Sequence, residues 1–131
     1  MMDCTDRHER YFLRLISKNT LLYTEMVVDE AINRGDKKKL LEFNINEKPV
    51  ALQLGGSSPN LLAKATKIGE DFGYDEINLN LGCPSKKVEK NKFGACLMKE
   101  PNLVADCLSQ MRAQTKLPVT IKTRIGYDDV E

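Results

Sequence analysis

Apolar and polar residues along the chain follow helical and strand periods in turn. Helices are expected at residues 6–17, 36–43 and 58–72 and from Pro101 onward, and strands at residues 20–26, 49–54, 75–81 and 118–125. The first helix carries four apolar residues at helical spacing, which are Tyr11, Phe12, Leu15 and Ile16. Four strands separated by helices predict an α/β fold with a parallel sheet built from right-handed βαβ units.

The helix expected at 58–72 has the clearest boundaries. Ser58 stands at the N-cap position, Pro59 at the first helical position, and Gly73 where a C-terminal cap belongs. Its apolar face consists of Leu61, Leu62, Ala65, Ile68 and Phe72. We therefore expect this helix to connect the strands at 49–54 and 75–81 into one βαβ unit.

The strands place polar side chains on one face and apolar side chains on the other. The polar members lie late on their strands and are Gln53, Asn78, Asn80, Lys122 and Arg124. Several strands that aim polar groups at one point are typical of the active site at the C-terminal rim of a (β/α)₈ TIM barrel. A doubly wound open sheet is the other fold that fits, but it usually carries a Gly-rich phosphate turn, and residues 55–57 do not match G-x-G-x-x-G. The polar faces therefore favour the barrel.

Length, composition and charge limit the class of protein. With 131 residues, 41% hydrophobic and 30% charged, the chain has the composition of an ordinary soluble globular domain. The formal net charge of +1 neither supports nor excludes a nucleic-acid partner. No apolar run approaches the ~18 residues of a membrane span, and the polar N-terminal residues do not resemble a signal peptide. We expect a cytoplasmic protein without a membrane partner, and no obligate protein partner is evident.

The cysteines and the histidine do not form a recognisable metal site. None of the four cysteines forms a Cys-x-x-Cys pair with another, and the only histidine is His8. The cysteines are Cys4, Cys83, Cys96 and Cys107. A zinc site and a disulfide framework are therefore both unexpected. A reducing compartment is the simplest setting for four such thiols.

Cys83 is the strongest candidate for catalytic chemistry. It follows the third expected strand, between Gly82, which leaves room for a planar ligand, and Pro84, which keeps the backbone of Cys83 extended. A thiol is mostly protonated at neutral pH, which suits a proton donor better than a nucleophile or a metal ligand. The alternative is a cysteine that only packs at a strand end, as we expect for Cys96 and Cys107.

Further polar side chains are candidates for ligand contacts. Gln53 can donate and accept hydrogen bonds, so it can bind the edge of a flavin or a base. Lys122 inside a barrel would need a negative charge, such as that of a reduced flavin, and an ion pair with Glu25 is the alternative. Arg124 could hold a phosphate or a base edge, or be a solvated charge at a strand end. The lysine-rich loop at 86–92 could contact RNA phosphates or be solvated.

Several sequence runs form a recognisable combination, including TLLYTEM at 20–26 and NLNLGCPS at 78–85. The matching segments are 5–8, 21–27, 49–56, 74–85, 93–98 and 119–126. Together they resemble the tRNA-dihydrouridine synthases, and the run at 20–26 resembles the A-type bacterial branch in particular. The resemblance covers the full length of the chain. It implies an FMN-dependent TIM barrel followed by a helical domain, acting on uridines in the D-loop of tRNA.

The resemblance also implies a reaction and the residues that take part in it. NADPH reduces FMN, a hydride passes from the flavin to C6 of uracil, and Cys83 protonates C5 after the base has left its stack. Cys83 matches the catalytic cysteine of the family, Asn80 matches a residue that contacts RNA, and we expect Arg124 to be a second substrate contact. The positions that match flavin contacts are Met1, Met2, Gln53 and Lys122.

The chain departs from the family pattern at both ends. In the family, an Ala-Pro pair and the rest of a first strand precede the methionine that matches Met1, and a whole barrel takes ~250 residues. We therefore expect residues 1–131 to be roughly the first half of a flavin-binding barrel, truncated at both ends. The C-terminal half-barrel and the helical RNA-binding domain would be absent, and the fragment alone would be inactive.

Two other functions stay open on the sequence alone. One is another flavin barrel that acts on a free pyrimidine, such as a dihydroorotate dehydrogenase. The other is a non-catalytic RNA-binding remnant. A helical RNA-binding domain would separate the synthase from the dehydrogenase, and bound yellow flavin would argue against the remnant.

Overall fold

The computed structural model describes residues 4–128 as helices packed on a parallel sheet. The helices are α1 (Arg7–Ile16), α2 (Asp29–Arg34), α3 (Lys37–Leu41), α4 (Pro59–Phe72), α5 (Lys86–Lys90) and α6 (Pro101–Ala113), with 3₁₀ turns η1 (Ile45–Glu47) and η2 (Gly94–Lys99). The strands are β1 (Leu22–Tyr23), β2 (Val27–Val28), β3 (Val50–Gly55), β4 (Glu76–Leu81) and β5 (Val119–Thr123).

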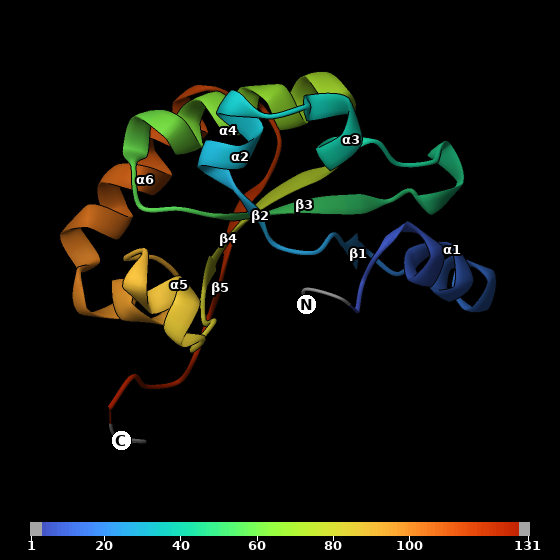
Figure 1. Ribbon diagram of the computed structural model, residues 1–131. Helices are drawn as coiled ribbons and strands as arrows, with labels where there is room; N and C mark the ends of the chain where they lie inside the picture. The colour runs from blue at the N-terminus through green and yellow to red at the C-terminus, as the bar shows by residue number, and fades with distance from the viewer. Residues whose placement is uncertain (1–3, 129–131) are drawn as a thin grey trace.

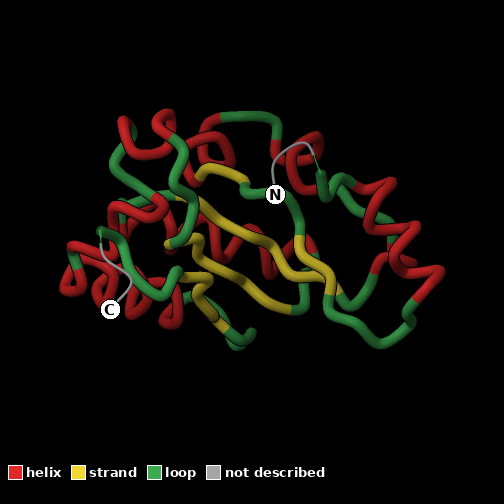
Figure 2. The backbone as a smooth tube through the Cα atoms, turned by 90° about the horizontal axis from the view of Figure 1, so that it is seen from below, coloured by secondary structure: helices red, strands yellow, loops and turns green. Residues whose placement is uncertain are grey.

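Every strand pair of the sheet is parallel, in the order β1-β3-β4-β5, and β2 also pairs with β3. Helices α2, α3, α4 and α6 lie on one side of the strands in Figure 1. Figure 2, seen from below, shows the strands running side by side across the middle of the molecule. The parallel strands form a half-barrel. The expected fold class, a partial (β/α)₈ barrel, is therefore confirmed.

Within the strand expected at 20–26 only the short strand β1 forms, and β2 follows directly after this range; both pair with β3. Between them, the backbone N–H of Gln53 donates to the hydroxyl Oγ1 of Thr24 at 3.0 Å. A side chain thus takes the place of a backbone acceptor in the ladder, so the two short strands are not continuous. The expectation of one uninterrupted strand was wrong for this reason.

Helix α4 begins and ends as its sequence predicts. The hydroxyl of Ser58 accepts a hydrogen bond from the backbone N–H of Leu61, and Pro59 is the first helical residue. Gly73 ends the helix in the left-handed region at φ +92°, where a residue with a Cβ is strained. On the inner face, Gly69 lets α4 approach the side chains of Leu52 and Ile77 closely. This contact joins α4 to β3 and β4 in the core.

The core lies between the sheet and the helices α4 and α6. All residues of the central strands β3 and β4 are buried, and Cys107 and Met111 of α6 belong to the same buried cluster. The edge strand β5 is different, because Ile121 is 44% exposed. The apolar face expected for 118–125 is therefore only partly covered. Within residues 4–128, no helix is both long and apolar enough to cross a bilayer.

Helix α1 does not bury the four apolar residues that recur along it at helical spacing. The exposed fractions of those side chains are large, at 47% for Tyr11, 58% for Phe12, 66% for Leu15 and 69% for Ile16. The buried residues of this helix are instead Arg10 and Arg14. The helical spacing of the apolar residues therefore does not mark the inner face of α1, because the surface that α1 meets is made of polar backbone and a carboxylate.

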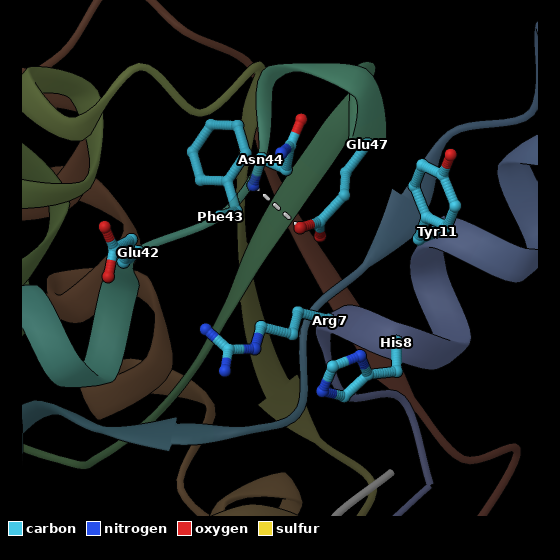
Figure 3. Close-up of a pocket in the computed structure, with 7 residues that line it drawn as sticks. All are labelled: Arg7, His8, Tyr11, Glu42, Phe43, Asn44 and Glu47. Atoms are coloured by element: carbon cyan, nitrogen blue, oxygen red, sulfur yellow. Dashed lines mark hydrogen bonds between the residues drawn. The ribbon is translucent and has the colours of Figure 1, made fainter.

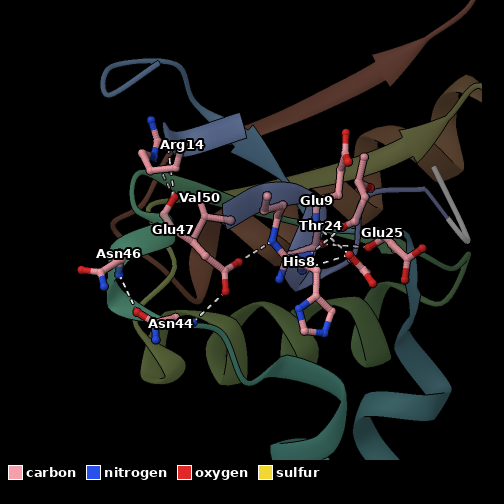
Figure 4. Close-up of polar contacts among 12 residues, drawn as sticks. His8, Glu9, Arg14, Thr24, Glu25, Asn44, Asn46, Glu47 and Val50 are labelled. Atoms are coloured by element: carbon pink, nitrogen blue, oxygen red, sulfur yellow. Dashed lines mark hydrogen bonds and ion pairs between the residues drawn. The ribbon is translucent and has the colours of Figure 1, made fainter. Parts of the chain in front are cut away.

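That surface is η1 and the residues that follow it (Figure 4). The guanidinium Nε of Arg10 donates to the carboxylate Oε2 of Glu47 at 2.6 Å. Arg14 donates to the backbone carbonyls of Glu47, Pro49 and Ser17. Two arginines can therefore be buried here because Nε and Nη1 of Arg10 and all three nitrogens of the Arg14 guanidinium find acceptors.

Candidate active site

Polar side chains from neighbouring strands meet on one face of the sheet. Gln53 of β3 lies opposite Asn78 of β4, which lies opposite Thr120 of β5. The amide Nε2 of Gln53 donates to Oδ1 of Asn78 at 3.0 Å, and Nδ2 of Asn78 donates to the hydroxyl of Thr120 at 2.8 Å. Gln53 is 6% and Asn78 is 3% exposed, so this row is held inside the half-barrel. The alternation of the strands predicted a polar face, and the strand register decides which members touch.

Asn80 joins this polar row to the end of β4. Its amide Nδ2 donates to Oε1 of Gln53 at 2.9 Å. Its carbonyl Oδ1 accepts the backbone N–H groups of Gly82 at 3.0 Å and of Cys83 at 2.9 Å. One buried side chain thus determines the turn that carries the thiol. Each amide still has donor and acceptor capacity that a ligand could use.

Cys83 is half-buried beside a pocket of about 250 Å³. The pocket is lined by Cys83, Pro84, Glu89, Ala95, Cys96, Arg124 and Tyr127. The backbone carbonyl of Cys83 accepts from the N–H of Ala95 at 3.0 Å. Gly94 at φ +75° leaves room for this approach, because a Cβ there would lie 2.8 Å from that carbonyl oxygen. Residues 94–95 therefore pack closely against the backbone of Cys83.

Lys122 and Arg124 are placed differently from each other. Lys122 is the register partner of Asn80, so both side chains lie on the same face of the sheet, away from the helix layer, and Lys122 is exposed. Arg124 lies beyond the end of β5, and its Nη1 donates to the carbonyl of Gly82 at 3.4 Å. The pocket beside Cys83 is therefore lined by Arg124, and by neither Gln53 nor Lys122. Within residues 4–128, hydrogen bonds link Gln53 to the backbone of Cys83 through Asn80.

Two other thiols were expected to be packing cysteines. Cys107 is fully buried, and burial raises the pKa of its thiol to about 11. Cys96 is only half-buried, and its Sγ donates to the carbonyl of Phe93 at 3.2 Å. Burial and the nearby Glu89 raise the pKa of Cys96. The prediction was confirmed for Cys107, but Cys96 shares the pocket of Cys83.

Some expected site residues cannot be placed in this way. Met1 and Met2 lie outside the described residues.

The lysine-rich loop at 86–92 contains the short helix α5, and Lys87 lines a pocket with Asn91 and Phe93. Among residues 4–128, no three His, Cys, Asp or Glu side chains come together as a candidate metal site.

A separate pocket of about 350 Å³ lies beside α1 (Figure 3). It is lined by Arg7, His8, Tyr11, Glu42, Phe43, Asn44 and Glu47. The backbone N–H of Asn44 donates to the carboxylate of Glu47 at 2.8 Å, which closes the capping box of η1. This pocket shares none of its lining residues with the pocket of Cys83.

Sequence reasoning missed the role of Thr120 and Glu76 in the polar row. Thr120 Oγ1 donates to Oε1 of Glu76 at 2.5 Å, and the hydroxyl of Tyr23 donates to the same oxygen at 3.0 Å. The available signal was parity, because Glu76 and Thr120 occupy the same face as Asn78 on their strands. Their contact joins residues 44 positions apart and depends on the strand register.

Comparison with known proteins identifies the family. The family model described as "Dihydrouridine synthase (Dus)" matches residues 1–131. The chain belongs to this family. The dihydrouridine synthase match includes the polar row, the turn held by Asn80 and the cysteine at the end of β4.

Three relatives of this dihydrouridine synthase chain are each named tRNA-dihydrouridine(20/20a) synthase. The Synechocystis protein is 60% identical over 128 residues, which are 98% of this chain and 38% of the relative. The Escherichia coli K12 protein is 60% identical over 129 residues, or 98% of this chain and 37% of the relative. The Xanthomonas campestris protein is 58% identical over 129 residues, with shares of 98% and 38%. The chain thus spans less than two fifths of the length of these relatives.

Proposed function

We propose that this chain supplies flavin and uridine contacts of an enzyme that reduces uridine to 5,6-dihydrouridine in the D-loop of tRNA. The observation that carries the proposal is the place of Cys83, a thiol at the C-terminal end of β4, where parallel barrels keep reactive groups. Asn80 holds the backbone of Cys83 and contacts the buried polar row at the same time. The names of the relatives point to positions 20 and 20a of tRNA as targets.

The side chains on the face of the sheet away from the helix layer offer hydrogen-bonding groups and a positive charge that suit FMN. Gln53 and Asn80 offer amide donors and acceptors for the edge of a flavin ring. Lys122 adds an exposed cation on the same face, which suits the negative charge of a reduced flavin. When bound and reduced by NADPH, FMN would supply the hydride for C6 of uracil. We further propose that Met1 and Met2 belong to the same cofactor site.

The proposed task of Cys83 is to donate its thiol proton to C5 of uracil. Its neighbour Arg124 carries a guanidinium into the same pocket and is the proposed substrate contact there, together with Asn80. The lysines of loop 86–92 would contact tRNA phosphates near the pocket. In this proposal residues 1–131 are the N-terminal part of a cytoplasmic flavin-binding barrel, and further sequence supplies the remaining strands and a helical RNA-binding domain.

The test uses a hybrid in which residues 1–131 replace the segment that they match in the Escherichia coli K12 synthase. The hybrid is produced in cells that lack their own enzyme, and dihydrouridine in tRNA is measured by mass spectrometry. We expect the wild-type hybrid to bind FMN and to form dihydrouridine. Cys83→Ala should leave the flavin absorbance intact and slow base reduction by about 10²-fold or more, the usual scale for a lost proton donor.

The matched control is Cys96→Ala, which removes a second thiol from the same pocket. It should change the rate far less than Cys83→Ala. Wild-type rates in the Cys83→Ala hybrid would remove Cys83 from the reaction. Turnover of free pyrimidines in place of tRNA would instead support a dehydrogenase-like function.

A further inference from the structure

A single chain of hydrogen bonds runs from the backbone of Cys83 across three strands to Glu76. The N–H of Cys83 donates to Asn80, whose amide donates to Gln53. The Gln53 amide donates to Asn78, and Asn78 donates to Thr120. The hydroxyl of Thr120 donates to the carboxylate of Glu76. The six groups of this chain are the backbone of Cys83 and the side chains of Asn80, Gln53, Asn78, Thr120 and Glu76.

All hydrogen bonds of this series run in the same donor-to-acceptor direction, and the groups at its two ends fix that direction. A backbone N–H such as that of Cys83 can only donate, and a carboxylate such as that of Glu76 can only accept. Between them, each amide accepts on its oxygen and donates from its nitrogen. Turning one amide over would bring two donors or two acceptors face to face inside a buried row. The amides of Gln53, Asn78 and Asn80 therefore hold one orientation together.

We propose that Glu76 is a positioning residue, which acts through Thr120 and Asn78 to orient the amides of Gln53 and Asn80 and so the turn of Cys83. The inference rests on the proposed function, in which Gln53 contacts the flavin, Asn80 contacts the substrate and Cys83 donates the proton. Glu76 itself lies at the start of β4, at the opposite end of the strand from the thiol, and is 9% exposed. Its role is to determine which atom each amide presents to a ligand.

The structure also provides a matched control, because Glu76 accepts a second hydroxyl. Tyr23 donates to the same oxygen, Oε1, at 3.0 Å, but it is not part of the chain to Cys83. Desolvation and the bond to Glu76 raise the pKa of Tyr23, so its hydroxyl stays a donor at neutral pH. Removal of either hydroxyl takes one hydrogen bond from Glu76. Only Thr120 also links Glu76 to Asn78.

The experiment compares Thr120→Val, Thr120→Ser and Tyr23→Phe. Valine has the shape of threonine without the hydroxyl and suits a strand, whereas serine keeps the hydroxyl. Hydrogen–deuterium exchange of the Cys83 amide and ¹⁵N spectra of the side-chain amides are recorded on the 131-residue chain. Both measurements are repeated in the hybrid with the Escherichia coli segment. A variant that unfolds as the 131-residue chain can then still be measured in the longer protein.

We expect Thr120→Val to shift the side-chain amide signals of Gln53 and Asn80 and to speed exchange at Cys83 by about tenfold. In the hybrid, kcat for dihydrouridine formation should fall by about tenfold, with KM for tRNA changed less than about twofold. Thr120→Ser should restore both, and Tyr23→Phe should leave both near wild type.

Two outcomes would overturn the positioning role. One is Thr120→Val with wild-type amide signals and exchange. The other is Tyr23→Phe with the same effects as Thr120→Val, because those effects would then not need the link from Thr120 to Asn78 on which the proposal depends. A wild-type hybrid that forms no dihydrouridine would defeat the proposed function, while the amide signals and exchange would still decide the positioning role.

Discussion

Replacement of Glu47 by alanine tests how α1 is attached to the half-barrel. Glu47 is 1% exposed, and its carboxylate accepts from Arg10 at 2.6 Å and from the N–H of Asn44 at 2.8 Å. Alanine removes both acceptors at once. Arg10, whose side chain is 7% exposed, would keep only its bond to the carbonyl of Thr5. A buried guanidinium then loses its counter-charge.

The expected loss follows from these contacts. Removing one partner of a buried ion pair costs roughly 3–5 kcal/mol, and the remaining bond of Arg10 favours the lower end. We therefore expect Glu47→Ala to lower the free energy of unfolding by about 3 kcal/mol. An unfolding entropy of ~2.1 cal/mol/K per residue over 131 residues converts this loss into a fall in Tm of roughly 11 °C.

The assay is thermal unfolding followed by circular dichroism at low micromolar protein. Lys67→Ala serves as the control, because Lys67 pairs with Glu70 and Asp71 on the exposed face of α4 and should matter little. The double variant Arg10→Met/Glu47→Leu should lose less than Glu47→Ala, since no charge stays buried. A Tm within about 2 °C of wild type for Glu47→Ala would refute the argument.

Three further predictions concern a cap, a buried acid and the sheet edge. Gly73→Ala should cost about 1 kcal/mol in urea unfolding, from backbone strain at positive φ alone, because nothing lies within 4 Å of the added Cβ. Burial raises the pKa of Asp29, whose Oδ2 lacks a partner, so Asp29→Asn should stabilise the protein at pH 7, and this gain should fade as the pH falls through the raised pKa of the folded protein and be gone below the ordinary value of 3.8. The edge strand β5 should cause concentration-dependent self-association of the 131-residue chain in sedimentation velocity, and Ile121→Lys should reduce it.

Local sequence signals were enough for the elements whose boundaries depend on neighbouring residues. Ser58, Pro59 and Gly73 fix the ends of α4, because caps and proline act within one turn of the helix. Alternation placed β3 and β4 correctly within a residue. The same alternation put Gln53 and Asn80 on one face, and strand ends placed Cys83 at the rim.

The inner face of α1 and the polar chain to Glu76 were decided only by tertiary structure. Helical spacing selects the apolar stripe of α1, but the surface it meets is η1, whose carboxylate and carbonyls bind Arg10 and Arg14 instead. The residues of the polar chain lie on three strands, so their contacts depend on register, which no short window of sequence contains. Sequence by itself determined α4, the central strands, the family and the candidate thiol, because those follow from local pattern and motif. Tertiary structure determined which polar groups meet, because hydrogen bonds between strands depend on residues far apart in the chain.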